Sequence, residues 1–132
     1  MSDSKVEEGL FYTKEHEWVK PEGDTALVGI SDHAQHLLTD VVFVELPAVG
    51  KVVEQFKPAC VVESVKSVSD VFAPLSGTVA EVNKELEGAP QLVNQDAYGK
   101  GWIFKLKPFD ASGKTNLMDA AGYRKFLSEQ TH

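Results

Sequence analysis

The ten residues VVESVKSVSD, from Val61 to Asp70, place one lysine, Lys66, at the middle of a run that otherwise reads as two short strands. Valines on both sides are typical of strands, while Ser64, Ser67 and Ser69 keep the centre free of bulky side chains. The pattern predicts a β-hairpin with Lys66 at its turn. An uncrowded turn lysine is a suitable substrate for an enzyme that docks on the backbone and acylates the amine. The simpler alternative is a solvated lysine that protects a sheet edge.

The elements around this hairpin follow a strand rhythm. Short runs rich in β-branched and aromatic residues recur along the chain, separated by Gly, Pro, Asn and Asp. They are EWVK, TALVGI, VVFVELP, KVVEQF, ACVVES, VSDVFAP, GTVAEVN and GWIFKLKP. A G-x-V-x-E pattern occurs on each side of Lys66, at 50–54 and 77–81, as expected if two similar β-units were joined by the hairpin. The rhythm predicts a mainly β protein, either a barrel or a sandwich.

Two stretches interrupt the strands and predict helices. A short helix is expected near 32–38, capped by Ser31 or Asp32, whose side-chain oxygens accept the first free amide hydrogens. A longer helix is expected near 115–128 from the spacing of its apolar residues. Gly122 weakens this second prediction, because glycine disfavours a helix interior. A surface loop is expected over 88–96.

Length and composition restrict the class of protein. The 132 residues suit one domain, so we expect a single domain over 1–132, with a core in about 10–127 and a flexible segment 1–8. The formal charge of −7 argues against nucleic acid and anionic lipid surfaces as partners. We also expect no membrane span, because no apolar run approaches the required length. The start MSDSKVEEGL lacks the features of a secretory signal or transit peptide and favours a bacterial cytoplasm, with the mitochondrial matrix as the alternative if a transit peptide was removed.

Few residues suit catalysis or metal binding. Cys60, the only cysteine, lies in an apolar stretch and is best explained as a small buried residue. His33 and His36 lie three apart on the expected short helix, but no third ligand accompanies them, so no metal site is expected. The sequence also lacks a nucleophile–base pair and a phosphate loop, and we therefore expect a protein that is not an enzyme.

A series of motifs stands in a recognisable order over roughly residues 10 to 127. They are E-H-E-W-V (15–19), G-I-S-D-H-A-Q (29–35), V-V-F-V-E-L-P (41–47), E-S-V-K-S-x-S-D (63–70), P-L-S-G (74–77), L-V-N (92–94) and Y-G-x-G-W (98–102). Each motif is weak alone, but their order and spacing make a specific signature. The chain resembles the glycine cleavage H-protein family.

This resemblance implies a fold and a set of site residues. The fold would be a flattened β-barrel, or barrel-sandwich hybrid, of lipoyl-domain type with a C-terminal helix. Lys66 matches the lysine that carries lipoic acid as N6-lipoyllysine, and no cofactor bound non-covalently is implied. Its motif flanks are Glu63, Ser64, Val65 and Ser67. Candidates for the cleft that shelters the arm are Glu17, Asp70 and His33, although plain surface carboxylates and a structural histidine are the simpler alternatives.

The implied function is that of a carrier, not a catalyst. In the family, the lipoamide arm accepts the aminomethyl group from the P protein, a glycine decarboxylase. The arm then passes the group to the T protein, an aminomethyltransferase that uses tetrahydrofolate. The L protein, dihydrolipoamide dehydrogenase, reoxidises the arm. A lipoate-attaching enzyme would be a further partner, and we expect the carrier to be a monomer.

The sequence departs from the family pattern at Thr39, where glycine is usual. If that glycine ends the short helix in a left-handed conformation, Thr39 is strained there, or else the helix ends differently.

Other proteins that carry a cofactor on a lysine also present that lysine in a hairpin turn. Biotin carriers usually flank the lysine with methionines, and lipoyl domains of 2-oxo-acid dehydrogenases are shorter. An H-like relay protein that donates lipoyl to those dehydrogenases stays open as an alternative.

Overall fold

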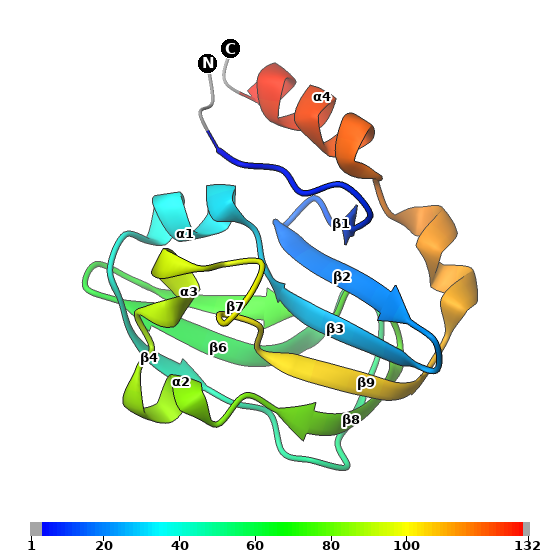
Figure 1. Ribbon diagram of the computed structural model, residues 1–132, viewed down its shortest axis with the longest axis horizontal. Helices are drawn as coiled ribbons and strands as arrows, with labels where there is room; N and C mark the ends of the chain where they lie inside the picture. The colour runs from blue at the N-terminus through cyan, green and yellow to red at the C-terminus, as the bar shows by residue number, and fades with distance from the viewer. Residues whose placement is uncertain (1–3, 131–132) are drawn as a thin grey trace.

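The computed structural model describes residues 4–130, which form two antiparallel sheets (Figure 1). The larger sheet has six strands in the order β1-β2-β3-β9-β8-β5 and the smaller has three in the order β4-β6-β7. The larger comprises β1 (Phe11–Tyr12), β2 (Glu17–Glu22), β3 (Thr25–Ile30), β5 (Val52–Val53), β8 (Gly77–Val82) and β9 (Phe104–Phe109). The smaller comprises β4 (Val41–Glu45), β6 (Pro58–Ser64) and β7 (Val68–Phe72).

The main core joins the two sheets. Val28 and Leu106 from the larger sheet lie in one buried cluster with Val44, Val62 and Val71 from the smaller sheet. Strand side chains alternate between faces, so each sheet contributes one apolar face to this cluster. The two sheets stay separate and do not close into one barrel within residues 4–130. The expected barrel-sandwich architecture is confirmed.

The short helix is also confirmed. Helix α1 spans Asp32–Leu38, and Ser31 caps it by accepting a hydrogen bond from Ala34 N at 3.2 Å. Thr39 ends α1 with φ 62° and ψ −146°, so the position that glycine usually occupies does have positive φ. Threonine rarely adopts this conformation, because its Cβ meets the backbone there.

The C-terminal helix begins later than the sequence predicts. A 3₁₀ helix spans Ala111–Asn116, and the α-helix α4 covers Ala120–Gln130. Between them Met118 forms a β-bridge with Tyr12, with Tyr12 N donating to Met118 O at 2.8 Å and Met118 N to Tyr12 O at 2.9 Å. A residue bridged in this way has extended backbone, so α4 starts only after Asp119, whose Oδ1 accepts from Gly122 N at 2.8 Å.

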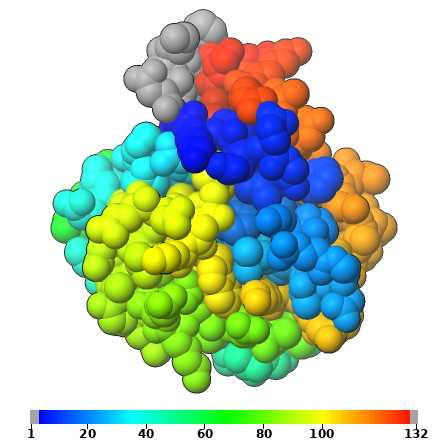
Figure 2. All heavy atoms as spheres, in the orientation of Figure 1, coloured from blue at the N-terminus to red at the C-terminus, as the bar shows by residue number. Residues whose placement is uncertain are grey.

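A second core lies under α4. Tyr12 and Trp18 from the larger sheet pack there with Ala120, Tyr123 and Leu127 from the helix. The rings of Tyr12 and Tyr123 stack with centroids 4.2 Å apart. Figures 1 and 2 show α4 and the N-terminal segment side by side on one side of the molecule. This packing gives the C-terminal helix a place beside the β1–β2 connection.

Residues 4–8, expected to be flexible, are hydrogen-bonded to the rest of the protein. Lys5 N donates to Asp32 Oδ2 at 2.8 Å, and Lys5 O accepts from Tyr98 Oη at 2.6 Å. Glu7 N donates to Tyr12 Oη at 2.8 Å. These bonds tie the segment to α1 and to the second core, while residues 1–3 lie outside the described residues.

Two further single-turn helices lie between β8 and β9. Helix α2 spans Glu85–Gly88 and α3 spans Leu92–Gln95, so part of the expected surface loop is helical. Val93 of α3 is fully buried in the main core, which anchors this segment against the sheets. In the described part of the chain, no helix has the length and apolar character needed to cross a membrane.

Candidate functional site

The predicted hairpin exists, and Lys66 lies in its turn. Strands β6 and β7 pair in antiparallel register up to Glu63 and Val68. Beyond that pair Ser64 N donates to Ser67 O at 2.8 Å and closes the turn. Lys66 is exposed at this tip, and Figure 1 shows the β6–β7 turn at one edge of the molecule. The amine is therefore open to an approaching enzyme.

Ser64 organises the turn from inside. Its side chain is 9% exposed, and its Oγ accepts from Lys66 N at 3.3 Å and from Ser67 N at 3.1 Å. A serine hydroxyl that bonds backbone amides two and three residues later replaces the Asn-Gly pair that many hairpins use. Val65, Ser67 and Val68 are exposed around the tip, whereas Glu63 is half-buried.

A cleft of about 320 Å³ opens beside β7. It combines apolar walls with acidic groups, and its lining residues are Glu15, His16, Glu17, Ile30, Ala34, Leu37, Leu38, Val62, Ser69, Asp70, Val71 and Phe72. Two of the predicted cleft residues, Glu17 and Asp70, thus lie in one cavity although 53 positions separate them (70 − 17). Packing of β2 and β7 around the same core brings them together.

Glu17 lies on the floor of the cleft and not at its rim. The residue is 2% exposed, its Oε1 accepts from Thr13 Oγ1, and its Oε2 accepts from Phe72 N at 3.2 Å. Burial raises the pKa of the Glu17 carboxyl to about 7, and the Thr13 and Phe72 hydrogen bonds moderate that rise. The group therefore titrates near neutral pH and can exchange a proton there.

Asp70 and His33 occupy different positions relative to the cleft. Asp70 is exposed on β7 and lines the cleft. His33 is absent from the lining. Its ring lies against that of His16, with centroids 4.7 Å apart, and His16 does line the cleft. The structure thus brings Glu17 and Asp70 together and places His33 behind His16.

His16 is a cleft residue that the sequence reasoning missed. Its backbone has φ 75°, and its Nδ1 lies 2.8 Å from Tyr123 Oη. Burial lowers the pKa of the His16 imidazole to about 4, with a further contribution from nearby His33. Its place between the two glutamates of the E-H-E-W motif was the available signal, because a turn that buries Glu17 must position its neighbour too.

The cleft suits an arm attached to Lys66. Ser69, the lining residue nearest to Lys66 in sequence, is three positions away, which is roughly 10 Å along an extended strand. A lysine extended by a lipoyl group reaches on the order of 10–15 Å from its Cα. Apolar walls match the hydrocarbon part of such an arm, and the Glu17 and Asp70 carboxyl groups match a cationic end.

Other candidate chemistry has weak support within residues 4–130. No group of three or more His, Cys, Asp or Glu side chains is placed to hold a metal ion there. Cys60 is buried, and burial raises the pKa of its thiol to about 12. A thiol with that pKa is almost entirely protonated at neutral pH and is a poor nucleophile.

Comparison with known proteins identifies the family of the chain. The family model described as Glycine cleavage H-protein matches residues 10–130. The chain belongs to this family. A glycine cleavage system H protein from Thermus thermophilus is 58% identical over 120 residues, which cover 91% of this chain and 94% of that protein. One from Alteromonas mediterranea is 54% identical over 128 residues, covering 96% and 99%.

A solved structure extends the likeness to the fold. The crystal structure of a glycine cleavage system H protein from Mycobacterium marinum superimposes with a TM-score of 0.81 at 32% identity. The match covers 96% of this chain and 100% of that one. The resemblance inferred from the ordered motifs is therefore confirmed.

Proposed function

We propose that this protein is the lipoyl carrier of a glycine cleavage system and that Lys66 carries the lipoyl group. The observation that supports this most directly is the exposed Lys66 at a closed hairpin turn, near a cleft lined by three carboxyl groups, those of Glu15, Glu17 and Asp70. Membership of the H-protein family supplies the biochemical setting. When bound, lipoyl supplies a dithiolane that opens to carry an aminomethyl group between enzymes.

The residues of this chain perform three tasks in that function. The Ser64 hydroxyl and the Ser64–Ser67 backbone bond hold the turn that keeps Lys66 exposed at its tip. The apolar residues of the cleft wall provide a surface against which the hydrocarbon part of the arm can pack. The Asp70 carboxylate attracts a cationic amine at the entrance, and the Glu17 carboxyl on the floor accepts or donates a proton near neutral pH.

His33 acts through its neighbour in this proposal. Its ring packs on His16, and its Nδ1 lies 3.3 Å from Ser4 Oγ, so it supports the wall from behind. Burial lowers the pKa of His33, and the nearby His36 contributes to the same direction. A neutral His33 and His16 pair adds no cation to a cleft that is built to receive one.

The partners follow from the family. We propose that the carrier exchanges its group with the P, T and L proteins and receives lipoyl from an attaching enzyme, without itself catalysing a step. The bacterial relatives favour a cytoplasmic setting. Tethering raises the effective concentration of the arm at each active site, so weak docking to each partner suffices.

Mass spectrometry tests this proposal. The protein is incubated with lipoate ligase, ATP and lipoic acid, and then with glycine and the decarboxylase. We expect a lipoyl increment on the peptide that contains Lys66 and then an aminomethyl increment on the same peptide. Lipoylation without loading would favour the lipoyl-relay alternative. No modification at Lys66 would refute the carrier proposal.

A further inference from the structure

The tip of the hairpin is bonded to the loop that follows α1. Val65 N, beside Lys66, donates to Asp40 O at 3.0 Å. Val65 is exposed, so this bond and the Ser64 contacts are what hold the backbone at the tip. The orientation of Asp40 O therefore affects how the hairpin presents Lys66.

Asp40 is exposed and lies between two residues that share a single partner. The Asn94 side chain of α3 spans them: its Nδ2 donates to Thr39 O at 2.7 Å, and its Oδ1 accepts from Val41 N at 2.9 Å. The two backbone groups fix the orientation of the amide, since one can only accept and the other can only donate. One side chain thus clamps the backbone on both sides of Asp40.

The clamp acts on a strained residue. Thr39 has φ 62° and ψ −146°, close to a region that almost only glycine adopts. Without the hydrogen bond to its carbonyl, Thr39 can relax to backbone dihedral angles of lower energy. That relaxation rotates the following peptide. Asp40 O would then move away from Val65 N. The strain makes the tip depend on Asn94 more than it would if glycine occupied position 39.

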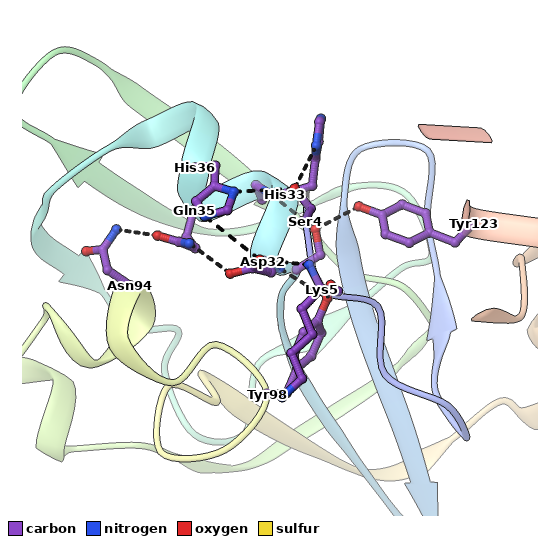
Figure 3. A network of polar contacts seen from close by, with 11 residues as sticks. Ser4, Lys5, Asp32, His33, Gln35, His36, Asn94, Tyr98 and Tyr123 are labelled. Carbon is purple, nitrogen blue, oxygen red and sulfur yellow. Dashed lines mark hydrogen bonds and ion pairs between the residues drawn. The ribbon is translucent and has the colours of Figure 1, made fainter. Parts of the chain in front are cut away.

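Asn94 is itself held by a chain of side chains. Its Nδ2 also donates to Gln35 Oε1 at 3.0 Å, and Gln35 Nε2 donates to Asp32 Oδ1 at 2.8 Å. Asp32 Oδ2 accepts from Lys5 N at 2.8 Å. Figure 3 shows this row running from the N-terminal segment across α1 to Asn94. Amides whose partners are all in place have few alternative rotamers.

We propose that Asn94 is a positioning residue for Lys66. Its amide clamps Thr39 O and Val41 N, so that Asp40 O holds Val65 N and keeps the turn in the conformation that a modifying enzyme accepts. The inference rests on the proposed function, because it assumes that Lys66 is the residue modified. It assigns to α3, which is distant from the hairpin in sequence, a role in the attachment step.

Asn94→Ala tests the proposal with Asn83→Ala as its matched control. Asn83 is a buried asparagine whose Nδ2 bonds Lys100 O and Trp102 O, both at 2.8 Å. It has no hydrogen bond to residues 39–41 or 64–67 in the described part of the chain. Both substitutions remove a side-chain amide that bonds backbone groups. Only Asn94→Ala removes the hydrogen bonds to Thr39 and Val41, on either side of Asp40.

The first readout is amide hydrogen exchange by NMR at Val65. Loss of the clamp should lower the protection of Val65 N about tenfold or more in Asn94→Ala and leave it unchanged in Asn83→Ala. The second readout is the steady-state kinetics of lipoate attachment to the wild type and each variant. If only a fraction of molecules presents the competent turn, the KM for the carrier rises by the inverse of that fraction, about fivefold, while kcat stays near the wild-type value.

Asn94→Asp is the second test variant, to be used if Asn94→Ala does not fold. It keeps an oxygen that accepts from Val41 N but removes the donor to Thr39 O, so it should shift both readouts in the same direction. Unchanged exchange at Val65 together with an unchanged KM would overturn the proposal, as would equal effects in Asn83→Ala. A wild type that is never lipoylated would refute the proposed function itself. Exchange at Val65 would still decide whether the clamp exists.

Discussion

Glu17 Oε2 accepts a hydrogen bond from Phe72 N across 3.2 Å, which joins the first residue of β2 to the last residue of β7. The bond connects the two sheets at the base of the cleft. It also shields one carboxyl oxygen from water, so a side chain that lines the cleft is at the same time a buried one. A carboxyl in this position responds to pH and to substitution in ways that a surface carboxylate does not.

The raised pKa of Glu17 predicts a pH effect on stability. With a folded pKa of about 7 against an ordinary value of 4.5, Glu17 stabilises the fold fully below pH 4.5 and loses that contribution as pH rises through 7. His16, with a folded pKa of about 4 against 6.5, behaves oppositely: its contribution is present above pH 6.5 and is lost as pH falls toward 4. The two dependences offset each other in the wild type.

Glu17→Gln separates these effects. The variant should be less stable than the wild type at pH 5, because one oxygen replaces two acceptors, and should gain about 2–3 kcal/mol relative to the wild type between pH 5 and pH 8. Urea denaturation of both proteins at several pH values measures this. A difference in the free energy of unfolding that does not vary with pH would contradict the raised pKa.

Glu17→Gln should also shorten the lifetime of the loaded carrier. A neutral amide holds an ammonium more weakly than a carboxylate does, so we expect the aminomethyl group to be lost several-fold faster from the variant. Timed mass spectrometry after removal of the decarboxylase measures the loss. Glu22→Gln, at the exposed far end of the same strand, is the control. Equal lifetimes for all three proteins would remove Glu17 from this role.

Thr39→Gly should stabilise the protein. Glycine adopts positive φ without a Cβ contact, so the variant should gain about 1 kcal/mol in the free energy of unfolding after its greater freedom in the unfolded chain is subtracted. Thr115→Gly, at an exposed position where φ is not positive, should lose stability instead. Chemical denaturation of both variants tests this, and a less stable Thr39→Gly would show that the threonine side chain outweighs the strain.

Tyr123→Phe should loosen the cleft wall without unfolding the helix. The change removes a hydroxyl that lies 2.7 Å from Ser31 Oγ and 2.8 Å from His16 Nδ1, and keeps the ring stacked on Tyr12. We expect a loss of about 1–2 kcal/mol, because buried polar groups lose a partner. Calorimetry measures the loss, and an NMR titration of His16 should show an altered pKa. An unaltered titration would mean that Tyr123 does not hold the His16 ring.

Lys66→Ala should abolish carrier activity and leave the fold intact. An exposed turn lysine contributes within about 0.5 kcal/mol to stability, so the melting temperature should hardly change. Glycine-dependent NADH formation with the P, T and L proteins should disappear. Lys84→Ala, an exposed lysine outside the hairpin, should retain it. A large fall in the melting temperature of Lys66→Ala would contradict the exposed position of its side chain.

Local patterns were enough to predict strands β2 to β9, α1 and the hairpin, whereas the two-residue strand β1 was missed. Alternating apolar residues and turn-forming residues act over a few positions, so a single sequence displays them. The C-terminal helix was placed too early, because its start depends on the bridge between Met118 and Tyr12. A contact between residues so far apart leaves no local pattern.

Some features of the candidate site can likewise be read from the sequence, and others depend on tertiary packing. Lys66 and the small residues around it, the acidic charge and the family motifs are properties of the sequence alone, and they led to the proposal of a carrier with Lys66 as its attachment residue. Only the tertiary structure decided that Glu17 is buried, that His16 and not His33 lines the cleft, and that Asn94 of α3 bonds the backbone on both sides of Asp40. Burial and long-range hydrogen bonds arise when distant segments pack together, and that packing decides the pKa of a carboxyl and the conformation of a turn.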